Sequence, residues 1–449
     1  MYINEIIKST NGLLLKGNNL LVKDFSIDTR TINKGEMYIS LKGDNNDGND
    51  FIESAIKKGC SGVIFSGNID ENIIKENNII FIKVEDTTVA LQQMAKYKRS
   101  KYNIPVVAIT GSVGKTSTKD IISSVMSKKY NVLSTKGNLN NHIGLPLTLL
   151  GLDNHDAMCI EMGMNHFKEL SLLTNILKPT LAVITNIGTA HIGNLGSREN
   201  ILKAKLEILE GLTTKQVIVN NDNDLLHNWN KKNNYYEVTT YGIKNKSDYI
   251  ANNIILNLDN STFDIKVNDK IHNIEIDVPG EHFIYNALCA ISVGNLLNID
   301  MLDIIDGIKD FKLSSKRMEI RKANDITLLI DCYNANYDSM KSAIEVLGKF
   351  KNRKIAVLGD MLELGEYSEE LHTKIGNVID ENNINILITV GNYSKYIYEN
   401  SNIDKKYKCK DNKEAIEILK NITKNDDIIL FKASNSMNFI EIVNNYAEK

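Results

Sequence analysis

Short apolar runs alternate with polar and helical segments along most of the chain. In residues 1–88, apolar runs at 62–65 and 79–82 are typical of strands, and the pattern at 51–58 predicts a helix before them. An amphipathic helix at 87–101 leads into the next stretch. Gly and Asn residues are frequent in the segments between these elements, as is typical of turns and loops. We therefore expect residues 1–88 to form a small N-terminal domain.

Residues 89–312 show a regular alternation of strands and helices. Continuous apolar runs typical of buried strands lie at 105–109, 157–160, 181–187 and 217–219. This alternation is typical of a mostly parallel sheet that helices cover on both faces. Between about 240 and 278 polar and apolar residues alternate singly, which predicts an antiparallel excursion.

The strand–helix alternation resumes in residues 313–449. Strands are predicted at 327–330, 355–358, 384–390 and 428–431, with helices at 339–350, 368–380, 414–420 and 437–446. Such a unit is Rossmann-like. The pattern thus predicts a three-domain α/β protein, which agrees with a length of 449 residues at roughly 150 residues per domain.

Charge and cysteine content narrow the class of protein. With 53 Lys+Arg against 56 Asp+Glu, the formal net charge is −3, so no global positive field favours nucleic acid or an anionic membrane. The five cysteines are scattered without a Cys-x-x-Cys pair, which excludes a zinc ribbon and a disulfide framework. No signal sequence or run of roughly 18 apolar residues is present. We expect a cytoplasmic protein without nucleic-acid or membrane partners.

The strongest local signal lies between the strand at 105–109 and a helix, and reads Thr110-Gly111-Ser112-Val113-Gly114-Lys115-Thr116. Backbone N–H groups of such a loop bind phosphate at the helix N-terminus. Lys115 would add positive charge at the β- and γ-phosphates, and Thr116 a hydroxyl ligand for Mg²⁺. The spacing departs from the usual phosphate loop, because Ile109 stands where Gly is required. An ordinary glycine-rich turn is the structural alternative.

Candidate metal ligands follow two neighbouring strands. Glu161 ends one strand and can reach Mg²⁺ directly or through water. His191 follows the next, although a lone His there is more often a loop residue. Lys203 and Lys205 lie on a predicted helix, where exposure is the simplest interpretation. A GTPase is a rival class because Asn-Lys-x-Asp occurs at 245–248, but its order relative to an Asp-x-x-Gly at 277–280 fits no GTPase.

Taken together, these segments resemble the Mur ligase family, the ATP-dependent amide-bond ligases of peptidoglycan precursor synthesis. The glycine-rich loop is similar to the family's short phosphate loop, which accounts for Ile109. Other similar segments are 138–146, 161–163, 185–188 with His191, 204–205, 280–282 with 286–287, 331–336 and 357–365. The resemblance implies the three-domain Mur ligase architecture, with a central phosphate-loop sheet and a C-terminal Rossmann-like domain.

The resemblance also implies a reaction and its participants. ATP, with Mg²⁺, would convert the terminal carboxylate of a UDP-N-acetylmuramoyl-tripeptide to an acyl-phosphate. D-alanyl-D-alanine would attack it to give the UDP-linked pentapeptide, ADP and phosphate. We expect a monomer. Another Mur-type ligase, a folylpolyglutamate-type ligase and a non-catalytic nucleotide-binding scaffold are the alternatives, and the third peptide residue stays open between lysine and diaminopimelate.

Roles for individual residues follow from the resemblance alone. The implied catalytic residues are Lys115, Glu161, His191 and Lys205, with Lys205 carbamylated; Thr116, Glu161, His191 and Lys205 would hold metal. The implied nucleotide contacts are Thr110, Gly111, Ser112, Val113, Gly114, Lys115, Thr116, Asn286, Arg317, Asp331 at the ribose, and Asn334 and Asn336 near the adenine. The implied substrate contacts are Thr29, Arg30, Lys42, Gly43, Asn138, Asn140 and Asn141. The chain departs from the family pattern at Asn49, Tyr337, Asn435 and Ser436.

Overall fold

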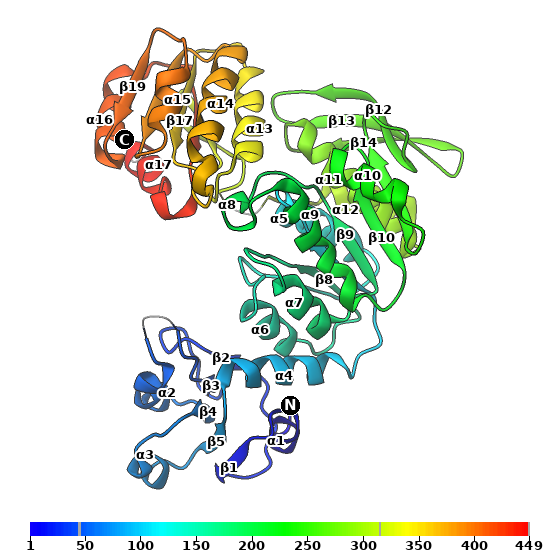
Figure 1. The fold of residues 1–449 in the computed structure, drawn as a ribbon, viewed down its shortest axis with the longest axis vertical. Coiled ribbons are helices and arrows are strands. Elements are labelled where there is room, and N and C mark those ends of the chain that lie inside the picture. Colours follow the sequence, from blue (N-terminus) through cyan, green and yellow to red (C-terminus); the bar gives the residue numbers. More distant parts are fainter. Residues whose placement is uncertain (44–45, 314–315, 448–449) are drawn as a thin grey trace.

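The chain folds into three α/β domains, each built on its own sheet (Figure 1). The computed structural model describes residues 1–43, 46–313 and 316–447. In Figure 1 the central domain lies between the N-terminal domain, in blue, and the C-terminal domain, in yellow to red. Within the described residues, no helix is both long and apolar enough to cross a membrane.

The N-terminal sheet has the order β1-β5-β4-β3-β2, and only β1 runs antiparallel to its neighbour. Its strands are β1 (Leu13–Lys16), β2 (Phe25–Ser26), β3 (Met37–Ile39), β4 (Gly62–Ser66) and β5 (Ile80–Val84). Its helices are α1 (Ile3–Thr10), η1 (Gly48–Phe51), α2 (Ile52–Lys57) and α3 (Glu71–Glu76). The strands predicted at 62–65 and 79–82 are confirmed as β4 and β5.

Helix α4 (Thr87–Arg99) connects this domain to the next. Asp86 caps it by accepting a hydrogen bond from the backbone N–H of Val89 at 2.9 Å. The helix packs on α1 of the first domain and on α6 (Gly144–Leu150) and α7 (Glu169–Leu177) of the second. The boundary predicted after residue 88 falls inside its first turn and stays a prediction.

The central sheet has nine strands in the order β14-β13-β12-β11-β10-β9-β6-β8-β7. These are β6 (Val106–Thr110), β7 (Val132–Ser134), β8 (Ala157–Glu161), β9 (Leu181–Ile184), β10 (Gln216–Asn220), β11 (Glu237–Gly242), β12 (Tyr249–Leu256), β13 (Ser261–Val267) and β14 (Lys270–Ile276). The pairs from β7 to β12 are parallel, and β12, β13 and β14 pair antiparallel. The antiparallel segment predicted between about 240 and 278 is confirmed, and its strands extend one edge of the same sheet.

Helices cover this sheet and bring the site residues to one edge. They are α5 (Lys115–Met126), α6, α7, α8 (Ile192–Leu195), α9 (Arg198–Leu206), η2 (Glu207–Gly211), α10 (Asp224–Lys232), α11 (Glu281–Leu296) and α12 (Met301–Lys309). Strand β6 lies between β8 and β9 and is parallel to both. Loops that follow these three strands therefore meet at the carboxyl edge of the sheet, where α/β proteins bind ligands.

The C-terminal sheet has the order β15-β16-β20-β17-β18-β19 and is parallel except for β15. Its strands are β15 (Glu319–Ala323), β16 (Ile326–Ile330), β17 (Lys354–Gly359), β18 (Ile386–Val390), β19 (Lys406–Cys409) and β20 (Ile428–Lys432). Its helices are α13 (Tyr337–Gly348), η3 (Gly365–Tyr367), α14 (Ser368–Glu381), α15 (Lys395–Asn400), α16 (Asn412–Ile422), η4 (Asn435–Met437) and α17 (Ile440–Ala447). The four predicted strands and four predicted helices are confirmed. The edge strands β15 and β19 were not predicted, because both are short, charged and partly exposed.

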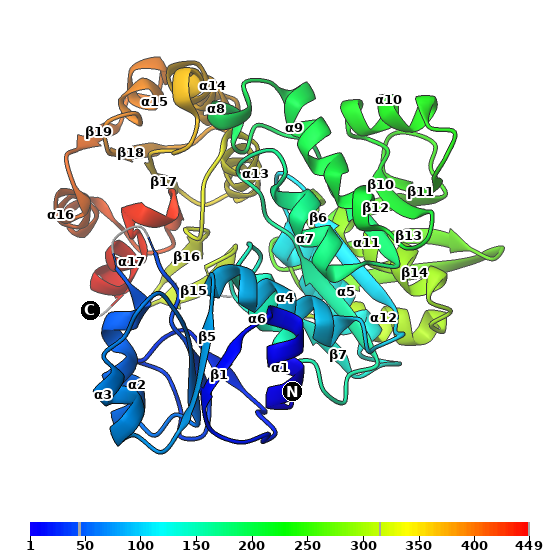
Figure 2. The same cartoon turned by 60° about the horizontal axis from the view of Figure 1, so that its bottom comes forward.

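The C-terminal domain touches the central domain beside α8. Helix α8 projects from the central domain toward α14 in both views (Figures 1 and 2), and it contacts η3. Buried apolar residues of α13, among them Met340 and Ile344, belong to the same core as the central sheet. The two domains thus share packed surface next to the carboxyl edge of the central sheet.

Candidate active site

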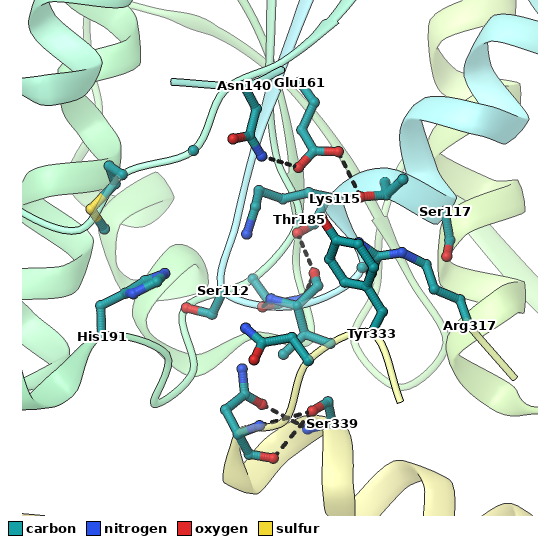
Figure 3. Close-up of a pocket in the computed structure, with 18 of the residues that line it drawn as sticks. Ser112, Lys115, Ser117, Asn140, Glu161, Thr185, His191, Arg317, Tyr333 and Ser339 are labelled. Atoms are coloured by element: carbon teal, nitrogen blue, oxygen red, sulfur yellow. Dashed lines mark hydrogen bonds between the residues drawn. The ribbon is translucent and has the colours of Figure 1, made fainter. Parts of the chain in front are cut away.

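A cavity of about 800 Å³ lies where the central and C-terminal domains meet (Figure 3). The glycine-rich loop, the ends of β8 and β9 and the start of α11 line it from the central domain. Residues that flank β15 and follow β16 line it from the C-terminal domain. Figure 3 shows His191 and Arg317 at opposite sides of this space, with Lys115 between them. Both domains therefore contribute to one site.

Two glycines explain the shape of the loop between β6 and α5. Gly114 precedes α5 with a φ of 80°, in the left-handed region that favours glycine. A Cβ on Gly111 would lie 1.9 Å from Oγ1 of Thr185, so the close approach of the neighbouring strand end requires glycine there. The loop is therefore a close-packed turn at a helix N-terminus, where backbone N–H groups are free to bind an anion.

The segment after β9 holds this loop in place. Asn186 accepts a hydrogen bond from the backbone N–H of Val113 at 2.9 Å and donates one to its carbonyl oxygen at 2.9 Å. The hydroxyl of Thr185 donates to the same carbonyl at 2.9 Å. The hydroxyl of Ser112 accepts from the backbone N–H of Gly188 at 2.9 Å. This bonding fixes the loop before any ligand binds, as preorganised phosphate binding requires.

Lys115 is the positive charge of the loop. Its Nζ donates to the carbonyl oxygen of Gly111 at 2.8 Å, so the side chain folds over the loop. Burial lowers the pKa of Lys115, the nearby charge of Glu161 opposes that shift, and Arg317 adds to it. The lysine faces the cavity beside the helix N-terminus, where a triphosphate would lie.

Glu161 ends β8 and is 2% exposed. One carboxylate oxygen accepts from the Thr116 hydroxyl at 2.6 Å and the other from Nδ2 of Asn140 at 2.7 Å (Figure 3). A buried carboxylate next to a hydroxyl offers the oxygen ligands that Mg²⁺ prefers. In the described parts of the chain, no three His, Cys, Asp or Glu side chains gather in a metal-binding arrangement. A cation at Glu161 would therefore need further ligands from substrate, water or a modified side chain.

His191 contacts the C-terminal domain. It has a φ of 63°, and its Nδ1 lies 2.7 Å from Oε2 of Glu363. Burial lowers the pKa of His191, and the hydrogen bond from His191 lowers the pKa of Glu363. The imidazole lines the cavity, so Glu363 holds one ring nitrogen and leaves the other for the site.

Lys205 is 1% exposed, whereas Lys203 on the same helix is exposed. Exposure, the simplest interpretation for a helix lysine, is therefore found for Lys203 and not for Lys205. Lys205 shares the buried part of α9 with Ile201 and Ala204. Burial lowers the pKa of Lys205 well below its usual value, and Lys115 adds to the shift. Lys205 also lowers the pKa of His191 through its charge, although it is not among the residues that line the cavity.

The nucleotide contacts implied for the C-terminal domain gather at the other end of the cavity. Asp331 follows β16 and pairs with Nζ of Lys432 at 2.6 Å. The Arg317 guanidinium lies over the ring of Tyr333, 3.9 Å from its centroid. From the central domain, Asn286 accepts from the Thr118 hydroxyl at 2.9 Å. This end presents an aromatic ring, a cation, a carboxylate and amides, the groups that recognise a nucleoside.

Most of the predicted site residues line this one cavity. They are Ser112, Val113, Gly114, Lys115, Thr116, Asn138, Asn140, Asn141, Glu161, His191, Asn286, Arg317, Asp331, Asn334 and Asn336. Thr110 and Gly111, at the start of the loop, and Lys205, on α9, are not among the residues that line the cavity. Four predicted substrate contacts, Thr29, Arg30, Lys42 and Gly43, belong to the N-terminal domain and do not line the cavity. Arg30 instead pairs with Asp28 at 2.7 Å.

Sequence reasoning gave no role to several residues of the site. Glu363 and Tyr333 lie in segments that resemble the family and Lys432 lies outside them, and nothing marked these side chains individually. The position along the chain could have indicated two of them. Lys432 ends β20 and Glu363 lies shortly after β17, and α/β proteins bind ligands at the carboxyl ends of such strands. Tyr333 carries no such signal beyond its place next to the predicted nucleotide contacts.

The comparisons with known proteins agree with this arrangement. Residues 22–99 match the description "Mur ligase family, catalytic domain", residues 109–294 "Mur ligase middle domain" and residues 316–435 "Mur ligase, glutamate ligase domain". The UDP-N-acetylmuramoyl-tripeptide--D-alanyl-D-alanine ligase of Bacillus subtilis is 35% identical over 437 residues, which cover 95% of this chain and 94% of that protein.

Two solved structures extend the likeness to the fold. MurF from Acinetobacter baumannii superposes with a TM-score of 0.89 at 28% identity, covering 99% of this chain and 98% of that one. MurF ligase from Thermotoga maritima in complex with ADP gives a TM-score of 0.83 at 25% identity, covering 96% and 99%. The chain belongs to the Mur ligase family. Within that family it is similar, from end to end, to the ligases that carry the name UDP-N-acetylmuramoyl-tripeptide--D-alanyl-D-alanine ligase.

Proposed function

We propose that this protein joins D-alanyl-D-alanine to a UDP-N-acetylmuramoyl-tripeptide at the expense of ATP, in peptidoglycan precursor synthesis. The observation that carries the proposal is the shared cavity. Two domains form this cavity. The fixed phosphate loop with Lys115 lies at one end, and Asp331 and the neighbouring groups suited to a nucleoside lie at the other. This arrangement suits transfer of the terminal phosphoryl group of ATP, and the likeness to ligases of this name over the full chain supplies the substrates.

The reaction runs in two steps, the first at the γ-phosphorus of ATP and the second at the acyl carbon. An oxygen of the tripeptide carboxylate attacks the γ-phosphorus, ADP leaves, and an acyl-phosphate forms. The amino group of D-alanyl-D-alanine then attacks the acyl carbon, phosphate leaves, and the nitrogen loses a proton to give the amide. Lys115 neutralises charge on the transferring phosphoryl group. The two domains enclose the acyl-phosphate and exclude water that would hydrolyse it.

Mg²⁺ fits the residues around Glu161. Thr116, Glu161 and His191 would hold it, since the buried Glu161 carboxylate bonds the Thr116 hydroxyl and all three side chains line the same cavity. Such a cation supplies charge neutralisation for two anionic reactants. Glu161 is aligned for this role by Asn140, whose amide occupies one of its oxygens.

Lys205 carries a carbamate in this proposal. Burial and the charge of Lys115 lower its pKa, so the side chain favours the neutral amine, the form that adds CO₂ with loss of one proton. The carbamate would be negatively charged beside Lys115 and would offer oxygen ligands to a cation. It would also add ligands to the cation site, because Glu161 and His191 alone supply too few.

The N-terminal domain binds the UDP-sugar end of the substrate in this proposal. Thr29, Arg30, Lys42 and Gly43 lie in loops of that domain. Asn138, Asn140 and Asn141 line the cavity and would contact the peptide as it approaches the phosphate loop. We place the protein in the cytoplasm, because all five cysteines are free and buried and its nucleotide substrates are cytoplasmic. As a step of cell wall synthesis, the reaction supports cell shape and division.

Phosphate release tests the reaction directly. The purified chain, with ATP and Mg²⁺, should release phosphate only when a UDP-muramoyl-tripeptide and D-alanyl-D-alanine are both present. Tripeptides ending in lysine and in diaminopimelate should be compared, since they differ in the side chain of the residue whose carboxylate is activated. Turnover with a folate and glutamate, or with a dipeptide substrate and a single amino acid, would assign a sibling ligase. ATP binding without any turnover would assign a nucleotide-binding scaffold.

Asp331→Ala should raise the KM for ATP about 10- to 100-fold and leave the KM for D-alanyl-D-alanine nearly unchanged. The loss corresponds to hydrogen bonds between a carboxylate and the ribose hydroxyls. Because Lys432 is buried and pairs with Asp331, the thermal unfolding midpoint should be measured as well. Asp331→Asn keeps an acceptor oxygen and serves as the milder control. Equal effects on both KM values would assign Asp331 a purely structural role.

A further inference from the structure

Two segments far apart in sequence meet beside the reaction site. One is the docking loop, residues 188–196, which follows β9 and includes His191 and α8. The other is the docking segment, residues 363–367, which precedes α14 of the C-terminal domain. The hydroxyl of Tyr367 donates to the carbonyl oxygen of Gly196 at 2.5 Å, and the backbone N–H of Gly193 donates to the carbonyl oxygen of Glu363 at 3.3 Å.

A second carboxylate of the C-terminal domain binds the start of the docking loop. One oxygen of Asp338, in the first turn of α13, accepts from the backbone N–H of Thr189 at 2.7 Å and from its hydroxyl at 2.8 Å. The docking loop therefore contacts the C-terminal domain at both ends, with His191 in between.

The contact between His191 and Glu363 lies within this interface. Both residues have left-handed backbones, with φ of 63° and 65°. Such conformations are uncommon in residues other than glycine and persist where the surrounding structure holds them. They turn the two side chains toward each other, so that Nδ1 of His191 donates to Glu363 at 2.7 Å. Since one imidazole nitrogen is bonded, the tautomer and the ring direction are both set.

We propose that Glu363 is a positioning residue that fixes the His191 imidazole across the contact between the docking loop and the docking segment. This rests on the proposed function for the role of His191 in the reaction. The carboxylate reaches His191 from the C-terminal domain, through the contact that Tyr367 and Gly193 also make. A carboxylate that orients a ligand histidine typically changes activity 10- to 100-fold.

Gly193 makes the docking step separately testable. A Cβ on Gly193 would lie 2.6 Å from N of Gly365, 2.7 Å from C of Leu364 and 2.8 Å from O of Glu363. All three atoms are backbone atoms of the docking segment, which cannot move aside as a flexible side chain does. The backbone of Gly193 is helical, so alanine suits the undocked loop. Gly193→Ala should therefore prevent docking without disturbing either domain.

The expected kinetic results separate positioning from docking. Glu363→Ala should lower kcat about 100-fold and Glu363→Gln, which keeps an acceptor oxygen, about tenfold, with the KM for ATP nearly unchanged in both. Gly193→Ala should also lower kcat, and adding Glu363→Ala to it should cause little further loss. Glu369→Gln and Asn194→Ala are matched controls on exposed positions of the same two regions and should behave as the parent protein.

Two measurements besides activity complete the test. The Nδ1 resonance of His191, assigned among the eight histidines with His191→Gln, should change tautomer pattern in Glu363→Ala but not in Glu369→Gln. Small-angle scattering with an ATP analogue and both substrates should show the parent radius of gyration for Glu363→Gln and a larger one for Gly193→Ala. A parent-like kcat or an unchanged His191 resonance in Glu363→Ala overturns the proposal, as does normal closure in Gly193→Ala. Absence of turnover in the parent protein would instead contradict the proposed function. In that case the His191 resonance and the small-angle scattering would still test the role of Glu363.

Discussion

Lys205→Met should lower kcat about 10²- to 10³-fold while the protein stays folded. The methionine keeps the apolar stem in its buried position but has no amine to add CO₂, so the proposed carbamate, with its negative charge and oxygen ligands, cannot form. Activity should be measured by phosphate release, and folding by circular dichroism and thermal unfolding. Lys203→Met, on the exposed side of the same helix, is the matched control and should keep most of its activity.

A rescue experiment distinguishes a missing carbamate from a damaged core. Lys205→Ala leaves space where the lysine stem was, and acetate or formate at high concentration should restore part of its activity. Lys205→Met fills that space and should not respond. With ¹³C-labelled bicarbonate, a carbamate carbon resonance should appear in the parent protein and in Lys203→Met but not in Lys205→Met. Full activity of Lys205→Met, or no such resonance in the parent protein, would rule out the carbamate.

Lys115→Ala should reduce turnover about 10²- to 10³-fold, the loss typical of removing one preorganised charge from a transition state. The loop itself should keep its shape, because Val113 and Ser112 are held by the segment after β9 and not by Lys115. Steady-state kinetics with ATP varied measures the effect. Lys115→Arg keeps the charge but not its compact geometry and should recover only part of the activity. Near-parent turnover of Lys115→Ala would mean that the loop does not bind the triphosphate.

The order of strands and helices and the phosphate loop could be predicted from local pattern. Buried runs such as 105–109 are continuous because parallel strands are covered on both faces. The glycines of the loop indicate a turn between strand and helix. The structure shows that Gly111 is required by the close approach of Thr185 and Gly114 by its left-handed backbone. The edge strands β15 and β19 could not be predicted in this way, since both are short and most of their residues are only partly buried.

The remaining site features depend on tertiary packing. Lys203 and Lys205 are two positions apart on α9, and only the way this helix packs decides which is buried. Glu363 approaches His191 across 172 positions of sequence, through the docking of two domains. No local pattern in a single sequence carries that information. The resemblance to the family identified the segments involved, but it gave neither the partner of His191 nor that of Asp331.

Helix α4 limits how this protein can be divided into exchangeable parts. At its end, the Arg99 guanidinium donates to the carbonyl oxygens of Leu177 at 2.8 Å and Lys178 at 3.1 Å, and so caps α7 of the central domain. At its start, buried residues such as Leu91 belong to the core of the N-terminal domain. A chimera that exchanges the N-terminal domain between homologues must therefore either move α4 together with its partners on both sides or redesign one face of it.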